Sequence, residues 1–328
     1  MGRAGRKLLG FILYSLFFPF FILYSAMPTL QKTALNSRAK LTPELAAFCK
    51  KHNLSARALL SVNPKTEKSL EETRILHLAP SIISGQNVCP NAGNCAKICL
   101  HFAGIPYLMG GKKTCRVRKT LAFFDDQQLF LELTATAILY NRSLLSEDEL
   151  LAVRLNGTSD ILWETLEFTV SPELSRVWQI KFGVYIVPTV YKSIPHMFSH
   201  YPELRIKLYD YTKNRHDWKE CSDIGYHLTF SFDGWDNEKN LYLASQAMAN
   251  NVNLAAAFNI KKGKKLEWDK ESADKVKRWL GAVPIILDGD KTDFRPGDIQ
   301  GGVIIGLRFK LPHGIKYTQA EKMAFCIA

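Results

Sequence analysis

The sequence predicts an α/β fold in which a parallel sheet forms a partial or complete (β/α) barrel of the TIM-barrel kind. Short apolar runs alternate with longer helical patterns from about residue 75 onward, which is typical of βαβ units. The apolar runs are rich in Val, Ile and Leu, as expected of strands that are buried on both faces. With 328 residues and 47% hydrophobic content, the chain can fill one large core.

Residues 1–26 are predicted to lie outside the folded domain. Their apolar stretch, LLGFILYSLFFPFFILYSA at 8–26, carries no charge and is close to the ~20 residues that cross a bilayer. It is therefore either a membrane anchor or the product of a misassigned start, with translation beginning at Met27 instead of Met1. A signal peptide fits less well, because Tyr24 stands where cleavage requires a small residue.

Residues 27–73 are predicted to form a helical and polar lead-in to that domain. Thr42 followed by Pro43 is a typical helix start, with Thr as the N-cap and Pro in the first turn. Residues 63–73, VNPKTEKSLEE, are polar and are expected to connect elements on the surface. The lead-in therefore has no core of its own.

A single catalytic domain is expected over residues 74–328, with seven strands. The predicted strands span residues 74–80, 151–157, 204–211, 226–232, 252–259, 283–289 and 301–309. Helical patterns at 125–141, 236–250 and 268–280 lie between several of them. Residues 165–200 fit either a helix or another strand pair.

Polar side chains follow almost every predicted strand. In parallel α/β folds the site lies at the carboxyl ends of the strands, so these side chains are expected to share one pocket. At any single strand end, Asp-Gly and Asn-Gly pairs also make ordinary turns. The candidate residues are Asn156, Asp160, Lys213, Ser231, Asp233, Asp288 and Asp290.

Three cysteines follow the first predicted strand with the spacing C-x5-C-x3-C: Cys89, Cys95 and Cys99. Cys115 lies further along the chain. A local cluster in a large chain indicates metal binding or redox chemistry more than a disulfide framework, with unpaired buried thiols as the plain alternative. Thiolates select zinc or iron–sulfur clusters. Four ligands would close the site, whereas three would leave one coordination position open.

The formal charge of +12 predicts attraction to an anion: nucleic acid, anionic lipid or a phosphorylated small molecule. Two basic runs are either phosphate contacts or solvated faces. They consist of Lys112, Lys113, Arg116, Arg118 and Lys119, and of Lys261, Lys262, Lys264 and Lys265. Because clustered thiols would oxidise outside a cell, the catalytic part is expected to be cytoplasmic.

This order of parts resembles radical S-adenosylmethionine enzymes. NGTSDILWE, from residue 156, occupies the place of their glycine–glycine–glutamate stretch, and LTFSFDG, from residue 228, is similar to their fourth strand. The resemblance implies that Cys89, Cys95 and Cys99 hold a [4Fe–4S] cluster. The spacing departs from the usual C-x3-C-x2-C of that superfamily.

The same resemblance implies roles for the strand-end residues. Asp160 and Asn156 would contact the amino group or ribose of S-adenosylmethionine. Ser231 and Asp233 would line the middle of the site, and Lys213 would position an anionic group. The substrate would be a nucleotide or nucleic acid.

A closer resemblance covers residues 60–328 and concerns uncharacterised bacteriophage proteins of the gene-product-88-like kind. Its motifs are CPNAGNCAKIC from residue 89, RLNGTSD at 154–160 and YDYTK at 209–213. The resemblance implies a phage protein acting in the host cytoplasm and supplies no mechanism.

Two other functions stay open at this point. In the first, the four cysteines hold a structural zinc, and Asp160 with Asp288 or Asp290 performs base exchange or glycosidic chemistry on nucleic acid. In the second, the chain is a metal-stabilised nucleic-acid-binding protein without catalysis. The strand-end aspartates favour catalysis, since carboxylates facing a phosphate backbone would weaken binding.

Overall fold

The computed structural model describes residues 40–62, 70–96, 99, 110–261, 263–310, 318 and 325–328. The apolar segment 1–26, the first part of the lead-in and most of the polar connection predicted at 63–73 lie outside the described residues. Within the described part of the chain, no helix has the length and apolar character needed to cross a membrane.

An eight-stranded sheet organises the fold, with the strand order β1-β2-β3-β6-β7-β8-β10-β9. Its strands are β1 (Leu60–Ser61), β2 (Glu72–Leu76), β3 (Leu151–Arg154), β6 (Ile206–Thr212), β7 (His227–Ser231), β8 (Leu254–Phe258), β9 (Ile286–Asp288) and β10 (Ile304–Arg308). Every neighbouring pair is parallel except β1 with β2. The seven predicted strands are therefore confirmed, each shorter than predicted.

The predicted barrel, partial or complete, is not confirmed, because the sheet formed by the described residues is open. Closure would require the two edge strands to pair. In the described residues, β1 and β9 are those edges and each has a single neighbour. β10 inserts between β8 and β9, so the last strand of the described residues lies inside the sheet. The fold is a mixed α/β fold with an open, mostly parallel sheet.

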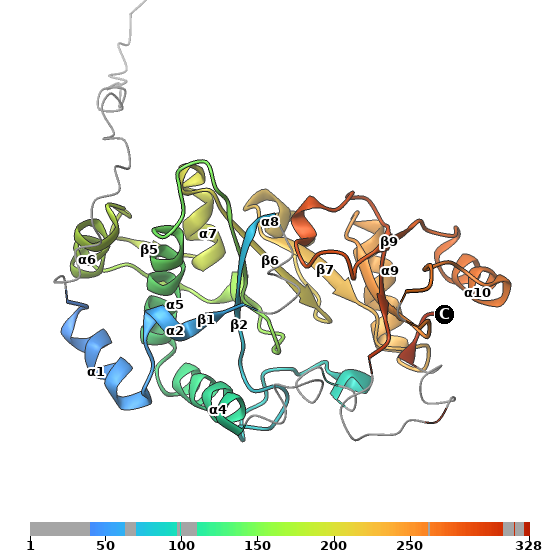
Figure 1. The fold of residues 1–328 in the computed structure, drawn as a ribbon, viewed down its shortest axis with the longest axis horizontal. Coiled ribbons are helices and arrows are strands. Elements are labelled where there is room, and N and C mark those ends of the chain that lie inside the picture. The colour runs from blue at the N-terminus through green and yellow to red at the C-terminus, as the bar shows by residue number, and fades with distance from the viewer. Residues whose placement is uncertain are drawn as a thin grey trace, which may run out of the picture.

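Helices pack around both ends of this sheet (Figure 1). They are α1 (Pro43–His52), α2 (Ala56–Leu59), α4 (Gly110–Asp125), α5 (Gln127–Arg142), α6 (Pro172–Phe182), α7 (Ile194–Ser199), α8 (Trp218–Asp223), α9 (Glu238–Ala249) and α10 (Lys270–Leu280). The predicted helix start is confirmed, since Thr42 Oγ1 accepts a hydrogen bond from the backbone N–H of Leu45. The three predicted helices correspond to α5, α9 and α10.

The ambiguous stretch 165–200 contains both of the structures considered for it. The short strands β4 (Phe168–Thr169) and β5 (Val190–Tyr191) pair antiparallel in a second sheet, and α6 lies between them in the chain. The described residues also form the 3-10 turns η2 (Gly93–Ala96), η4 (Trp163–Thr165), η5 (Pro202–Leu204) and η6 (Arg295–Gly297).

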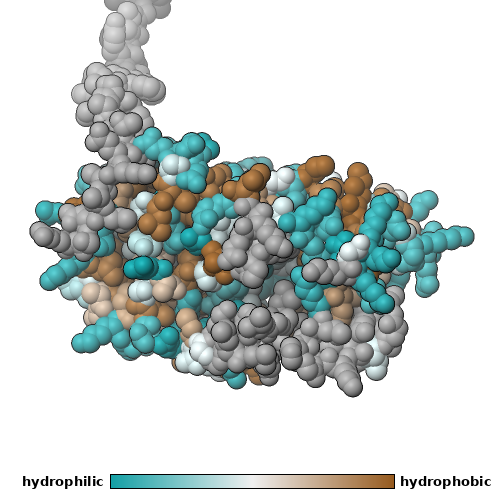
Figure 2. Space-filling view, in the orientation of Figure 1, coloured by the Kyte–Doolittle hydropathy of each residue, from teal (hydrophilic) through white to brown (hydrophobic). Residues whose placement is uncertain are grey.

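The core has one large cluster and a second one beside it. The large cluster joins α5 to β2 and β3 and contains Phe130, Trp163 and Trp178. The second joins β7 and β8 to α9 around Phe230 and Phe258. Consecutive residues of β3, β7 and β8 are buried, which confirms burial of these strands on both faces. Hydrophilic side chains cover the outer part of α10 at one end of the molecule (Figure 2).

Candidate functional site

A cavity of about 750 Å³ lies at the carboxyl ends of the parallel strands. It is lined by the loop after β2, the turn after β3, the ends of β6, β7 and β10, the middle of β8 and the loop after β9. The lining includes Cys89, Cys95, Cys99, Asn156, Gly157, Asp160, Thr212, Lys213, Ser231, Asp290, Arg308 and Lys310. Most of the residues predicted from the strand ends thus meet around one space large enough for a cofactor.

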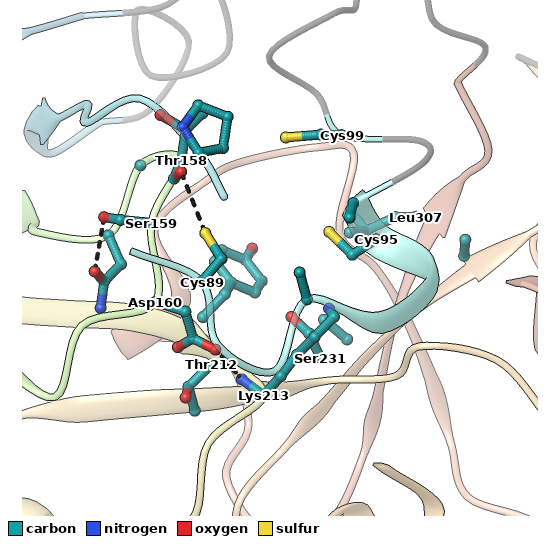
Figure 3. Close-up of a pocket in the computed structure, with 18 of the residues that line it drawn as sticks. Cys89, Cys95, Cys99, Thr158, Ser159, Asp160, Thr212, Lys213, Ser231 and Leu307 are labelled. Atoms are coloured by element: carbon teal, nitrogen blue, oxygen red, sulfur yellow. Dashed lines mark hydrogen bonds between the residues drawn. The ribbon is translucent and has the colours of Figure 1, made fainter. Parts of the chain in front are cut away.

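Cys89, Cys95 and Cys99 border this cavity on one side, with their sulfur atoms turned toward a shared space (Figure 3). Cys89 Sγ donates to the carbonyl oxygen of Thr158 at 3.7 Å. Burial is the main cause that raises the pKa of Cys89 to about 12, opposed by a backbone hydrogen bond from Ser81. This thiol is therefore protonated at neutral pH.

Asp233 supports the cysteine loop from outside the cavity. Its carboxylate is fully buried and accepts the backbone N–H of Asn94 at 2.9 Å and that of Cys95 at 2.8 Å. Asn237 Nδ2 donates to the same carboxylate at 2.8 Å. Gly93 has a φ of +50°, and a side chain there would overlap Asp233. Asp233 is not among the cavity-lining residues, so the cavity gives no support for its predicted place in the middle of the site.

Asn156 holds the turn after β3, although it also borders the cavity. Its Oδ1 accepts from Ser159 Oγ at 2.9 Å, from the backbone N–H of Ile161 at 3.0 Å and from Trp163 Nε1 at 3.0 Å. Its Nδ2 donates to the carbonyl oxygen of Ile161. Because these bonds use the side-chain amide locally, Asn156 is a structural residue of the turn.

Gly157 lets the same turn approach β2 closely. Its backbone N–H donates to the carbonyl oxygen of Leu76 at 2.9 Å. A Cβ at this position would lie 2.6 Å from that oxygen and 2.5 Å from His77 Nδ1. The glycine of the NGTSD motif is therefore explained by packing of the turn against β2.

Asp160 presents an acceptor to the cavity. Its side chain is buried, and its Oδ2 accepts the backbone N–H of Lys213 at 2.9 Å. Its Oδ1 is buried and has no hydrogen-bond partner among the described residues. Burial raises the pKa of this carboxyl group. A ligand that brings a cationic or hydroxyl donor would satisfy this oxygen.

Arg308 forms ion pairs with both Asp288 and Asp290. The guanidinium Nη1 lies 2.9 Å from Asp288 Oδ1 and 3.2 Å from Asp290 Oδ2. The hydrogen bonds from Arg308 lower the pKa of Asp288, so this carboxylate stays ionised. Asp288 does not line the cavity, whereas Asp290 does. A carboxylate held in an ion pair is a poor general acid, which removes support for the predicted roles of this pair.

Cys115 lies on α4 and is not among the cavity-lining residues, so the structure does not bring it together with the other three at the cavity. Its neighbour Arg116 is close enough to Cys99 and Cys115 for both thiols to influence its guanidinium electrostatically. Lys119 is buried and donates to the carbonyl oxygen of Leu59. Lys119 therefore does not make the phosphate contact that was considered for it. Lys261, Lys264 and Lys265 belong to the second basic run and are exposed.

Two features of the site were missed from the sequence. The first is Asp210 on β6, a strand-end residue to which no role was assigned. It is fully buried, and it accepts from the backbone N–H of Asn156 and from Tyr226 Oη, both at 2.6 Å. The second is a group formed by Glu164, His216 and Cys221, whose ligand atoms lie within 4.8 Å of one another. The separation of Glu164 from His216 in the sequence follows no metal-ligand spacing.

We expect Asp210→Asn to change the pH dependence of stability. Burial raises the pKa of Asp210 to about 7, above the ~3.9 of an unfolded chain, so the folded state holds the proton more tightly. The stability that Asp210 contributes is present below the unfolded pKa and is lost as pH rises through about 7. Urea unfolding at pH 5 and pH 8 should show the variant gaining stability relative to the parent chain at the higher pH. The prediction would be contradicted if the difference in stability between the variant and the parent chain were the same at pH 5 and pH 8.

The fold and the cavity define a class: an open parallel α/β protein with a cysteine-bearing cavity at its strand ends. The chain matches the family model described as gene product 88 over residues 44–328, and it belongs to this family. No curated protein and no solved structure matched the chain. The comparisons confirm the gene-product-88-like resemblance and do not support the more distant one to radical S-adenosylmethionine enzymes.

Proposed function

We propose that this chain is a metal-dependent enzyme in which Cys89, Cys95 and Cys99 bind a [4Fe–4S] cluster and the adjoining cavity holds S-adenosylmethionine. The observation that carries the proposal is the arrangement of three thiols around one strand-end cavity. Such a cluster supplies an electron to the bound ligand, and the protein orients the two. The proposed substrate is a nucleotide or another phosphorylated molecule.

The donor set of the cavity fits this cofactor. Thiolates are the usual ligands of iron–sulfur clusters, and three of them leave one iron without a protein ligand. Arg116 lies close enough to Cys99 for its positive charge to offset the negative charge of bound thiolates. The cavity volume of about 750 Å³ lies within the range of cofactor sites.

The other lining residues give the cavity two chemically different parts. Asp160 offers an unpartnered buried oxygen, which suits an ammonium or hydroxyl group of the ligand. Lys213 brings positive charge, which suits a phosphate or carboxylate, whereas Arg308 and Lys310 are paired with Asp288 and Asp290. Lys213 follows β6 directly, so its backbone positions Asp160 while its side chain borders the cavity.

The alternative of zinc-supported catalysis by strand-end aspartates has less support. Asp288 is outside the cavity lining, and Arg308 forms ion pairs with both Asp288 and Asp290. Cys115 does not complete a fourth position at the cavity. Of the three aspartates in this alternative, only Asp160 keeps support for its predicted role, because it borders the cavity and one of its oxygens has no hydrogen-bond partner among the described residues.

The test is the metal content of the full chain after anaerobic purification and reconstitution with iron and sulfide. We expect about four irons and four sulfides per chain, with visible absorption that dithionite bleaches. A colourless chain that holds zinc at Cys89, Cys95 and Cys99, or no metal there, would contradict the proposed function.

A further inference from the structure

A second group of metal-ligating side chains lies behind the cavity wall, next to Thr212. Glu164 belongs to η4, His216 precedes α8, and Cys221 lies within α8. The side chains of Glu164 and His216 are 8% and 2% exposed, and Cys221 is buried. Their ligand atoms lie within 4.8 Å of one another. None of the three lines the cysteine cavity.

Hydrogen bonds hold His216 in one orientation. Its Nδ1 lies 2.6 Å from Glu164 Oε1, and its Nε2 lies 2.7 Å from Thr212 Oγ1. Thr212 Oγ1 is itself fixed by the backbone N–H of Asn214 at 2.9 Å. A ligating histidine normally has its second ring nitrogen fixed by a neighbouring polar group, and Thr212 occupies that place here.

Among the described residues, the ion pair of this group is the one between His216 and Glu164, and it involves one oxygen of the carboxylate. Glu164 Oε2 is buried without a hydrogen-bond partner in that part of the chain. Burial is the main cause that raises the pKa of Cys221, and the nearby Glu164 carboxylate raises it further. An unpartnered carboxylate oxygen beside a buried thiol is costly without compensation. A divalent cation would satisfy the oxygen and, with one carboxylate and one thiolate, would give a site of zero net charge.

We propose that Glu164, His216 and Cys221 bind a divalent transition metal of the zinc class at a site separate from the cysteine cavity. The combination of one sulfur, one imidazole nitrogen and one carboxylate suits zinc and is unlike the all-oxygen sets of magnesium or calcium. Glu164 can supply a second oxygen. On binding, the Cys221 thiol releases its proton to solvent, and His216 keeps one proton, on Nε2, where it donates to Thr212.

This metal would join two segments that shape the cavity. Glu164 follows the turn of Asn156 and Asp160, while His216 and Cys221 follow the end of β6. Through Thr212, the site would fix the strand end next to Lys213 and Asp160. The proposed role of the metal is to stabilise the part of the cavity wall that these two segments form.

The test uses the full chain carrying Cys89→Ala, Cys95→Ala and Cys99→Ala, which removes the three thiols of the cavity. Once circular dichroism shows that this chain is folded, we expect it to bind one equivalent of zinc, and of cobalt(II) with a thiolate-to-cobalt charge-transfer band. Adding Cys221→Ala should abolish the band. Adding Cys49→Ala, a buried cysteine on α1, should preserve it.

Two outcomes would overturn the inference: a folded triple variant that binds no zinc or cobalt, and a band that survives Cys221→Ala. If the Cys221 variant fails to fold, X-ray absorption at the zinc edge of the loaded triple variant decides. One sulfur with nitrogen and oxygen ligands supports the site, whereas none or several sulfurs contradicts it. Because this test measures zinc in a chain without Cys89, Cys95 and Cys99, its failure is independent of the iron result.

Discussion

Replacing any one of Cys89, Cys95 or Cys99 with alanine is expected to abolish binding of a stable iron–sulfur cluster. Each thiolate of the proposed site binds a different iron, so loss of one leaves that iron without a protein ligand. No other cysteine of the described residues lines the cavity and could replace it. Iron and sulfide content after anaerobic reconstitution, together with visible absorption, measures the effect.

Cys115→Ala is the matched control for these three variants. Cys115 is partly buried like the others and lies near them in sequence, but it sits on α4 and does not line the cavity. Its replacement is expected to leave iron content and absorption unchanged. A loss of iron in Cys115→Ala equal to that in Cys95→Ala would contradict the three-ligand site.

Asp233→Ala is expected to destabilise the chain and to weaken cluster binding. The substitution leaves the partly buried backbone N–H groups of Asn94 and Cys95 without their charged acceptor. The loss of these two hydrogen bonds should lower the free energy of unfolding by about 3 kcal/mol. Because the same bonds fix the turn that carries Cys95, iron content after reconstitution should fall as well.

Asp236→Ala tests whether the effect is specific to the buried carboxylate. Asp236 also bonds the cysteine loop, accepting from Asn94 Nδ2 at 2.7 Å, but its side chain is exposed. Its loss should cost less than about 1 kcal/mol, as expected of an exposed polar contact. Equal effects of the two substitutions in urea unfolding and iron content would show that Asp233 does not anchor the loop.

The strands could be predicted because their signal is local. LAVR, LTFS and LAAAF are buried along nearly their whole length, and that burial is visible as an apolar run. The position of the cysteines beyond the first parallel strand follows from the same reading. The open edge could not be predicted, because the insertion of β10 between β8 and β9 depends on pairing between segments distant in sequence.

Residue roles at the site were harder to predict than residue positions. Asp233 and Asn156 stand at strand ends as expected. Backbone donors of the distant cysteine loop occupy the side chain of Asp233, whereas Asn156 uses its side chain within its own turn. Asp288 looked available for catalysis, but Arg308 reaches it from β10. For Asp233 and Asp288 the deciding partner lies elsewhere in the chain, where no spacing rule connects the two. Asp160 differs because one of its oxygens remains without a partner in the described structure.

The most direct test of the central claim is the electron paramagnetic resonance spectrum of the anaerobically reconstituted full chain, reduced with dithionite, with and without S-adenosylmethionine. The account predicts the signal of a reduced [4Fe–4S] cluster that changes shape when S-adenosylmethionine is added, because one iron is open to a ligand. An iron-loaded chain without this signal, or a signal that saturating S-adenosylmethionine leaves unchanged, would contradict it.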